Sequence, residues 1–249
     1  MPNLAPFELP AATATALPLY LRIAELLTRE IAAGHYRSGE RLPAEETLAQ
    51  RLGVATGTLR KGLDVLRQRG LLVRRQGSGT YVRSADAPRP EGRSIYEFFR
   101  LERVAGGGLP TAAVLDLRSL RKPAHVPDFG AGATQRCHRL RRLRCLNGEP
   151  VALEEIWFDA RHVPALREQA LSEALYQFYQ QSLGFWIARV EDRVGTGQVP
   201  DWTRRPFGPE AGQACGMIER WSWAGSGLLE EYSTTWFDAT LARYVARWS

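Results

Sequence analysis

The fold of the N-terminal part of this chain is decided by the stretch Leu52-Gly53-Val54-Ala55-Thr56-Gly57-Thr58-Leu59-Arg60-Lys61-Gly62-Leu63. Leu59 and Leu63 recur at helical spacing, which predicts a buried face, and Gly53 permits a sharp turn just before this helix. The preceding residues 42–49 have the pattern of a supporting helix with Pro43 in its first turn. Together the two segments predict a helix-turn-helix.

The outward face of the second helix is small, polar and basic, as a helix that enters the major groove of DNA requires. Arg60 and Lys61 are expected to meet phosphates or guanines, and Thr56 and Thr58 to meet phosphates or thymine methyl groups. Gly57 lies on the same face. We therefore predict that these five residues bind DNA.

The flanking segments complete a winged helix-turn-helix. Residues 18–34 predict an amphipathic helix, and the runs 71–75 and 80–83 predict two strands joined by a glycine turn. In such a wing the glycines let the backbone approach the sugar-phosphate ridge closely, and neighbouring arginines supply charge. The wing residues expected at the DNA are Gly77, Ser78, Gly79 and Thr80.

Positive charge is concentrated in this same region. The 249-residue chain has a net charge of +6, and residues 18–83 hold 12 Lys or Arg against 6 Asp or Glu, a surplus equal to that of the whole chain. A basic module joined to a neutral remainder predicts one part that binds a polyanion and another that binds something else. Charge alone would also fit a basic surface that merely faces solvent, but here a motif coincides with it.

The composition argues against several other classes of protein. Cys137, Cys145 and Cys215 are widely scattered, which argues against a disulfide framework or a zinc site and for a reducing compartment. The four histidines lack metal-ligand spacing, and no Ser-His-Asp order stands out, so we predict no metal, no cofactor and no catalytic residue. Neither a leader segment nor a stretch of about 20 apolar residues is present, which predicts a soluble cytoplasmic protein without a membrane partner.

The rest of the chain predicts a second, α+β domain. Residues 1–17 suggest a flexible arm and residues 84–93 a linker, which leaves domains at residues 18–83 and 94–249. Asn147-Gly148, between two extended runs, is a strong hairpin signal, so the second domain should contain an antiparallel sheet. Its strands are expected at residues 112–120, 138–146, 151–158, 186–195, 215–223 and 229–237, with a helix at 164–182.

Several motifs of the N-terminal module carry a family resemblance. They include Pro18-Leu19-Tyr20, Gly39-Glu40-Arg41-Leu42-Pro43, Leu52-Gly53-Val54, Thr58-Leu59-Arg60 and Gly77-Ser78-Gly79-Thr80-Tyr81-Val82. With these motifs the module resembles the DNA-binding domain of GntR-family bacterial transcription regulators. It departs from the family at Glu46, where arginine is usual, and at Ala55-Thr56, where Ser-Arg is usual. Both family arginines touch DNA, so the resemblance implies the family's docking mode with a different operator sequence.

A second set of motifs lies in the C-terminal part. It consists of Arg142-Leu143-Arg144, Asn147-Gly148-Glu149-Pro150-Val151-Ala152-Leu153-Glu154, Ala174-Leu175-Tyr176 and Glu231-Tyr232-Ser233. These residues resemble the ligand-sensing UTRA domain of the HutC subfamily of GntR regulators, which shares the fold of chorismate lyase. The resemblance implies a dimerising domain with a small-molecule pocket, lined by Arg142, Arg144, Glu154, Glu231 and Tyr244.

The residues themselves are compatible with such a pocket. Strand alternation places Arg142 and Arg144 on one face, with Glu154 on the partner strand. Two guanidinium groups can bind a carboxylate or phosphate bidentately, while a glutamate can bind a hydroxyl or an amine. The alternative is an exposed strand whose arginines form only cross-strand ion pairs.

These observations lead to one functional hypothesis and two alternatives. We expect a homodimeric repressor in the bacterial cytoplasm, associated with the nucleoid, that binds a roughly palindromic double-stranded operator with half-sites about 34 Å apart. A small phosphorylated or carboxylated effector would bind the C-terminal domain and release the DNA. The alternatives are a C-terminal domain with residual lyase-type activity and a DNA-binding protein that responds to no effector.

Overall fold

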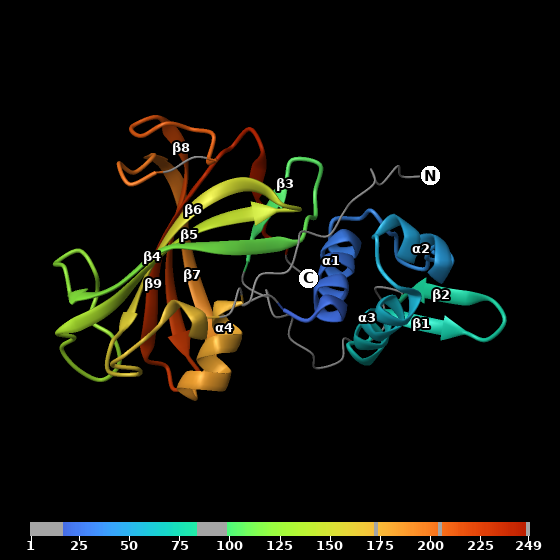
Figure 1. The fold of residues 1–249 in the computed structure, drawn as a ribbon, viewed down its shortest axis with the longest axis horizontal. Coiled ribbons are helices and arrows are strands. Elements are labelled where there is room, and N and C mark those ends of the chain that lie inside the picture. Colours follow the sequence, from blue (N-terminus) through green and yellow to red (C-terminus); the bar gives the residue numbers. More distant parts are fainter. Residues whose placement is uncertain (1–16, 84–98, 172–173, 204–205, 248–249) are drawn as a thin grey trace. The chain divides into compact units, whose positions relative to one another are not determined.

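The computed structural model describes residues 17–83, 99–171, 174–203 and 206–247, and the chain divides into two compact units, Met1–Leu109 and Pro110–Ser249 (Figure 1). Most of the predicted arm, residues 1–17, and all of the predicted linker, residues 84–93, lie outside the described residues. Residues 99–109, which we placed in the second domain, group with the first unit. The domain boundaries therefore stay a prediction.

The first unit is a winged helix-turn-helix. It consists of α1 (Leu19–Ala32), α2 (Glu45–Arg51), α3 (Thr56–Gln68) and the antiparallel hairpin of β1 (Leu72–Arg75) and β2 (Gly79–Val82). The three helices and the hairpin bury one shared core, which confirms the predicted periodicity. Central members of that core are Ile23, Leu27, Leu48, Leu59 and Leu66.

Two details of this unit show how its sequence directs the turn. Gly53 has a φ of 63°, a left-handed conformation that glycine adopts without steric cost, and this places α3 across α2. Pro43 does not lie in the first turn of α2, as predicted, because the helix begins at Glu45 with Ala44 as its N-cap. Ala44, with a ψ of 144°, still has an extended backbone, so the helix begins only after it and Pro43 lies two residues before the first helical residue.

Residues 99–109 complete the first unit by packing onto α1. Buried Arg29 donates hydrogen bonds to the carbonyls of Phe99, Leu101 and Gly108. Its neighbour Glu30 accepts a hydrogen bond from the Gly108 amide at 3.0 Å. One turn of α1 therefore offers a cation to the carbonyls and a carboxylate to an amide of the same segment, which includes the short strand β3 (Leu101–Arg103).

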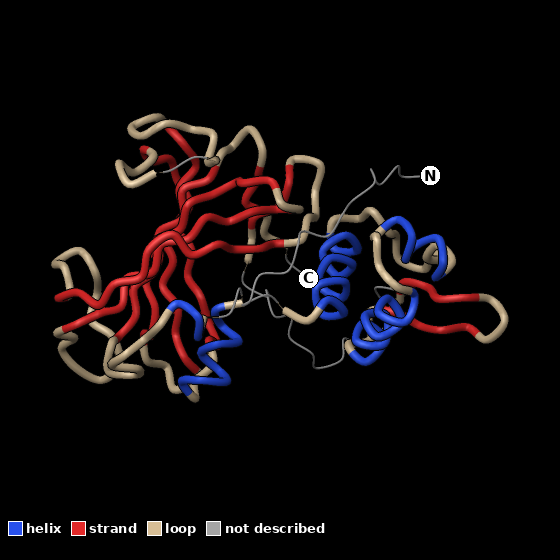
Figure 2. Tube along the Cα trace, viewed as in Figure 1, coloured by secondary structure: helices blue, strands red, loops and turns tan. Residues whose placement is uncertain are grey.

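The second unit is built on one antiparallel sheet of six strands, shown in red in Figure 2. The order across the sheet is β4-β5-β6-β9-β8-β7. The turn between β5 and β6 has positive φ at both Asn147 (53°) and Gly148 (82°), which confirms the predicted hairpin. The strands are β4 (Pro110–Arg121), β5 (Arg136–Leu146), β6 (Glu149–Asp159), β7 (Ile187–Gln198), β8 (Ala214–Ala224), β9 (Leu229–Phe237) and the short β10 (Ala242–Tyr244).

The predicted helix at residues 164–182 is wrong in its extent. Within the described part of that segment there is a 3-10 turn (Glu168–Ala170), a short α4 (Leu175–Phe178) and a π-helical turn (Tyr179–Leu183). Leu171, Ala174 and Leu175 are buried. Leu171 and Ala174 are buried with a non-helical backbone, so contacts with the rest of the unit bury this segment without one continuous helix.

The two faces of the sheet differ in what covers them. Tyr179, which follows α4, packs its ring against Phe158 at 5.5 Å between centroids, so α4 lies on the face that carries Phe158. We call this the helix face and the opposite one the outer face. By strand alternation, Glu154 lies on the helix face, and Glu155 and Trp157 lie on the outer face.

Candidate nucleic-acid interface and small-molecule site

The predicted DNA-binding face of α3 is accessible within the first unit. Gly57, Arg60 and Lys61 are exposed and Thr56 and Thr58 half-buried. The opposite side of the helix is buried in the core at Leu59, Gly62, Leu63 and Leu66. One helix thus anchors itself through its apolar side and presents a polar, basic side to solvent.

Arg60 has a partner that the sequence did not suggest. Its Nε donates a hydrogen bond to Glu45 Oε2 of α2 at 2.6 Å, and this interaction raises the pKa of the Arg60 guanidinium. Glu45 and Arg60 lie on different helices, 15 residues apart in the sequence, so helical periodicity could not predict their contact. The contact holds a long side chain at the exposed start of α3.

The tip of the wing is ordered by an aromatic contact. The Arg75 guanidinium lies 4.4 Å from the centroid of the Tyr81 ring, and the Tyr81 hydroxyl is hydrogen-bonded to Ser78 Oγ at 2.6 Å. Gly79, with φ of 118°, lies against the guanidinium of the exposed Arg41, which sequence reasoning missed. Gly77 is exposed, and Ser78 and Gly79 are half-buried.

Thr80 does not fit the predicted set. Its relative exposure is 9%, and its carbonyl accepts a hydrogen bond from the Leu42 amide within the unit. Alternation along β2 turns Thr80 inward. We therefore do not expect its side chain to reach DNA.

On the helix face of the second unit, Glu154 binds two arginines. Arg142 donates to Glu154 Oε2 from both Nε (2.9 Å) and Nη2 (2.6 Å), and Arg144 Nη1 lies 3.6 Å from the same oxygen. Both arginines are nearly inaccessible, at 4% and 3% exposure. Burial pushes the pKa of Glu154 up, but the two guanidiniums outweigh this and leave it lowered.

A second carboxyl, Glu231, is surrounded by hydroxyl groups. Tyr179 donates to Glu231 Oε2 at 2.7 Å, and Tyr176 and Ser222 donate to Oε1 at 3.1 and 3.0 Å. Burial raises the pKa of Glu231, the hydrogen bond from Tyr179 opposes this, and the nearby charge of Glu154 adds to the rise. This carboxyl is therefore easier to protonate than Glu154.

A third group joins strands β7 and β8 to the C-terminal end. Arg220 donates two hydrogen bonds to Asp192, both of 2.6 Å, and the Tyr244 hydroxyl donates to Asp192 Oδ2 at 2.7 Å. The structure therefore brings Arg142, Arg144 and Glu154 into direct contact. It places Glu231 and Tyr244 in neighbouring groups, because Tyr176 binds both Glu231 and Arg220, and Arg220 and Tyr244 both bind Asp192.

Five further members of this cluster escaped sequence reasoning: Tyr176, Tyr179, Asp192, Arg220 and Ser222. Tyr176 belongs to the Ala174-Leu175-Tyr176 motif, so the sequence did offer a signal for it. The others lie on elements that meet only in the folded sheet.

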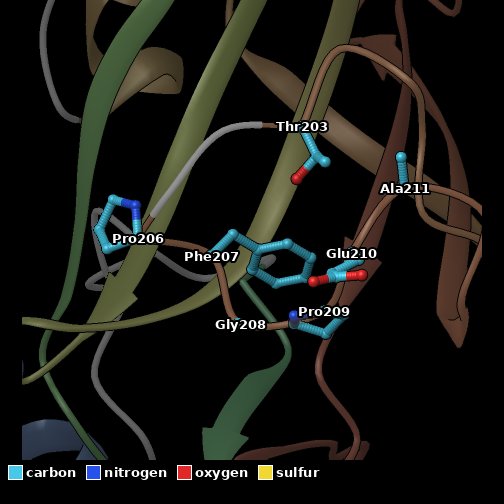
Figure 3. A pocket seen from close by; sticks show the side chains of 7 residues that line it. All are labelled: Thr203, Pro206, Phe207, Gly208, Pro209, Glu210 and Ala211. Atoms are coloured by element: carbon cyan, nitrogen blue, oxygen red, sulfur yellow. The ribbon is translucent and has the colours of Figure 1, made fainter.

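Two cavities of the second unit lie away from this cluster. One of about 420 Å³ lies in the connection between β7 and β8, where Thr203, Phe207 and Glu210 line it (Figure 3). The other, of about 240 Å³, lies on the outer face beside Asp116, Arg141 and Trp202. Neither contains any of the five predicted effector residues. The buried cluster, with its converging charges and hydroxyl groups, is the better candidate for small-molecule recognition.

The described part of the chain shows two further features relevant to function. None of its helices combines the length and apolar character needed to cross a membrane. Its His, Cys, Asp and Glu side chains form no group of three that could hold a metal ion.

Comparison with known proteins identifies relatives of both units. The UTRA domain model matches residues 105–243, and the model for bacterial regulatory proteins of the gntR family matches residues 19–82. The HTH-type transcriptional regulator SmoD of Agrobacterium fabrum is 48% identical over 235 residues, covering 94% of this chain and 98% of SmoD. The mannosyl-D-glycerate transport/metabolism system repressor MngR of Escherichia coli is 31% identical over 187 residues, covering 71% of this chain and 73% of MngR.

Solved structures show a likeness of fold. YydK of Bacillus subtilis superposes with a TM-score of 0.51 at 22% identity, covering 94% of this chain and all of that chain (100%). The ligand-binding domain of a GntR-family regulator from Bordetella bronchiseptica gives a TM-score of 0.54 at 20% identity, covering 64% of this chain and 100% of that chain.

The curated relatives are transcription regulators, which confirms the prediction that the chain is not an enzyme and removes the lyase alternative. An N-terminal winged helix-turn-helix followed by a UTRA domain also confirms the predicted architecture. The chain belongs to the GntR family of DNA-binding transcription regulators and, with its UTRA domain, to the HutC subfamily.

Proposed function

We propose that this regulator is a homodimeric repressor that a small anionic effector releases from its operator. The observation that carries the proposal is the buried pair Arg142 and Arg144, which converge on one carboxylate oxygen of Glu154. Charged groups are costly to bury and are retained where they bind something or hold a specific arrangement. MngR, named as a repressor, supports repression as the mode of action.

The surrounding side chains suggest how an effector would be recognised. A phosphate or carboxylate would share the two guanidiniums with Glu154. Tyr176 and Ser222, which now bind Glu231, would offer hydroxyl groups to neutral polar parts of the effector. An effector that combines an acidic group with hydroxyl groups fits this arrangement best.

The first experiment is a thermal-shift screen with phosphorylated sugars, phosphonates, amino-acid derivatives and small carboxylates. A compound that raises the melting temperature is then titrated into the protein with and without bound operator. Because effector and DNA affinities are linked, operator must weaken effector binding by the factor by which effector weakens operator binding. Equal effector affinity in both titrations would contradict the proposed release.

A variant separates the two binding functions. Arg144→Ala is expected to bind operator like the native chain but to lose the response to the effector, since its side chain lies at 4% exposure in the helix-face cluster. Arg121→Ala, an exposed arginine at the end of β4, is the control. A native response in Arg144→Ala would remove this arginine from the effector site.

A further inference from the structure

One face of the wing carries two arginines. Arg41, which lies before α2, forms a β-bridge with Tyr81 of β2, and Tyr81 also pairs with Val73 of β1. Arg75 pairs with Gly79, two residues nearer to the tip of the hairpin. Because directly paired residues project to the same face of a sheet, one face consists of Arg41, Val73, Arg75, Gly79 and Tyr81. We call it the arginine face.

The two guanidinium groups on this face are positioned by different neighbours. That of Arg75 stacks on the Tyr81 ring, 4.4 Å from its centroid. That of Arg41 lies along the backbone at Gly79, where a Cβ atom would come within 2.8 Å of Arg41 Nε. Any side chain at position 79 would therefore displace Arg41, so the glycine makes room for the guanidinium. Two arginines that are already positioned lose less side-chain entropy when they bind.

The donors of Arg41 are available to a partner. Within the described residues, neither Arg41 nor Arg75 forms an ion pair, and the exposed Arg41 guanidinium donates no hydrogen bond. The two groups lie over residues two positions apart on β2, a step of about 7 Å along a strand. Like charges at this separation repel each other, and an anionic partner relieves the repulsion. The arginine face is therefore suited to a polyanion.

The recognition helix offers fewer available cations than the number of its basic residues suggests. Of the three on α3, Arg60 binds Glu45 and Arg67 binds Asp64. Within the described residues, this leaves Lys61 as the cation of α3 without an acidic partner. The affinity of a protein for DNA rises with the number of cations that meet phosphates or the grooves. The arginine face adds two such cations.

The chain connects the arginine face to the start of α3. Glu45, which binds Arg60, follows Arg41 by four residues, a stretch that spans no more than about 14 Å. The hairpin of β1 and β2 extends away from the three helices (Figure 1). When α3 enters the major groove, a neighbouring extension of this kind can reach the adjacent minor groove.

We propose that Arg41 inserts into this adjacent minor groove and selects A·T pairs there, while Arg75 binds the flanking phosphates. The narrow minor groove of A·T-rich DNA concentrates negative potential and attracts arginine. Gly79 keeps the wing thin beside Arg41, as a groove only about 6 Å wide requires. A G·C pair places a 2-amino group in the minor groove, where it obstructs a guanidinium. Arg41 thereby contributes to sequence specificity from outside the recognition helix.

This inference concerns DNA affinity alone and depends on neither the effector nor the dimer of the proposed function. The test uses the full chain and a duplex that it selects from random sequences. Hydroxyl radicals cleave DNA at sugars exposed in the minor groove. The native chain should protect a tract that Arg41→Ala leaves exposed. Arg51→Ala removes an exposed arginine at the last residue of α2 and should protect the tract like the native chain.

The protected tract is then prepared with A·T, G·C or inosine·C pairs. Inosine lacks the 2-amino group of guanine, so an inosine·C pair has the minor-groove edge of A·T and the major-groove edge of G·C. In fluorescence anisotropy, the native chain should bind the A·T and inosine·C duplexes equally and the G·C duplex about tenfold more weakly. Arg41→Ala should bind all three duplexes with equal affinity.

Several results would overturn the role of Arg41. They are an unchanged cleavage pattern in Arg41→Ala, a native chain that binds the inosine·C duplex like the G·C duplex, and a tenfold preference that persists in Arg41→Ala. A native chain without the preference would overturn it too, even if Arg41→Ala lost affinity, because Arg41 would then bind phosphate only. If Arg41→Ala fails to fold, as judged by circular dichroism, Arg41→Lys replaces it. Because this variant keeps the charge, it should bind the G·C duplex like the native chain and lose the preference.

Discussion

Glu154 and Glu231 lie on neighbouring strands of the helix face, and their surroundings move their pKa values in opposite directions. Burial favours the protonated form of both. At Glu154 the guanidiniums of Arg142 and Arg144 overcome burial, whereas at Glu231 the partners are neutral hydroxyl groups and the charge of Glu154 adds to the effect of burial. Partner chemistry therefore decides which carboxylate stays ionised.

This difference predicts the pH dependence of stability. Because the folded-state pKa of Glu231 is raised above its usual 4.5, its contribution to the free energy of unfolding is present below that value and is lost as pH rises through the folded-state pKa. Glu154 has the opposite sign, and its contribution is lost as pH falls through its lowered pKa. Glu231→Gln should therefore remove the loss of stability toward higher pH. Urea unfolding at several pH values measures this, with exposed Glu210→Gln as the control; an unchanged pH profile would contradict the assignment.

Gly216 predicts a packing defect that can be measured. It lies opposite Phe237, and a Cβ at position 216 would overlap the ring of Phe237, which is only 6% exposed. Gly216→Ala should lower the free energy of unfolding by about 1–3 kcal/mol, as overpacking a core does. Gly195→Ala on the neighbouring strand meets no atom within 4 Å and is the matched control. If the two variants were equally stable in urea, the Phe237 ring would be able to move aside and accommodate the added methyl group without cost.

Arg60 is the residue of α3 whose loss should weaken DNA binding most directly. It is exposed and oriented by Glu45. Arg60→Ala should reduce operator affinity by about 1–3 kcal/mol if the guanidinium grips a base or phosphate. Arg67→Ala, on the last turn of the same helix, removes the same charge away from the predicted interface. Fluorescence anisotropy at fixed salt compares the two, and equal affinities would show that a different part of α3 reads the DNA.

At the scale of elements, the contact between α1 and residues 99–109 combines the polar contacts of Arg29 and Glu30 with the apolar packing of Leu109 into the core of the first unit. Arg29→Met would leave the carbonyls of Phe99, Leu101 and Gly108 without their buried donor, at a cost of about 1–3 kcal/mol. Hydrogen exchange of the amides in residues 99–109 should accelerate, while that of α3 stays unchanged. Arg51→Met, an exposed arginine of α2, is the control. Unaltered exchange would show that Arg29 does not hold this segment.

The elements that the sequence predicted well are those with a local cause. Glycines at positions requiring positive φ marked the turns at Gly53 and Asn147-Gly148, and alternation marked the six strands. The helix at residues 164–182 was predicted too long, because Leu171 is buried with an extended backbone, whereas Leu175 and Phe178 are buried within the short α4. The prediction that Pro43 lies in the first turn of α2 was wrong because the sequence alone does not distinguish a proline just before a helix from one in its first turn.

At the scale of the whole molecule, the sequence identified the charged residues of the candidate site that lie on one hairpin, but not the partners that distant elements contribute. Arg142, Arg144 and Glu154 sit on adjacent strands joined by a tight hairpin, so local pairing predicts their contact. Tyr179 contacts Glu231, and Asp192 contacts Tyr244. Each of these pairs is separated by 52 residues in the sequence. Only the assembled sheet shows those contacts.

A dimeric regulator also makes a prediction about operator geometry. Two recognition helices reach successive major grooves only if the half-sites lie about one helical turn apart. In an operator selected from random duplexes, inserting about five base pairs between the half-sites should abolish cooperative binding, and about ten should restore part of it, since ten returns both half-sites to one side of the duplex. A gel-shift titration measures this. An operator affinity that does not change with the insertions would mean that each winged helix-turn-helix binds DNA independently.

Both edges of the six-stranded sheet are interrupted. Edge strand β4 has an extra residue, Leu115, between Val114 and Asp116, and edge strand β7 has one, Ala188, between Ile187 and Arg189. Such bulges bend the free backbone groups out of line and so deny a foreign strand a regular template. Deleting Leu115 or Ala188 would straighten an edge and expose the chain to open-ended growth into fibrils during expression and storage.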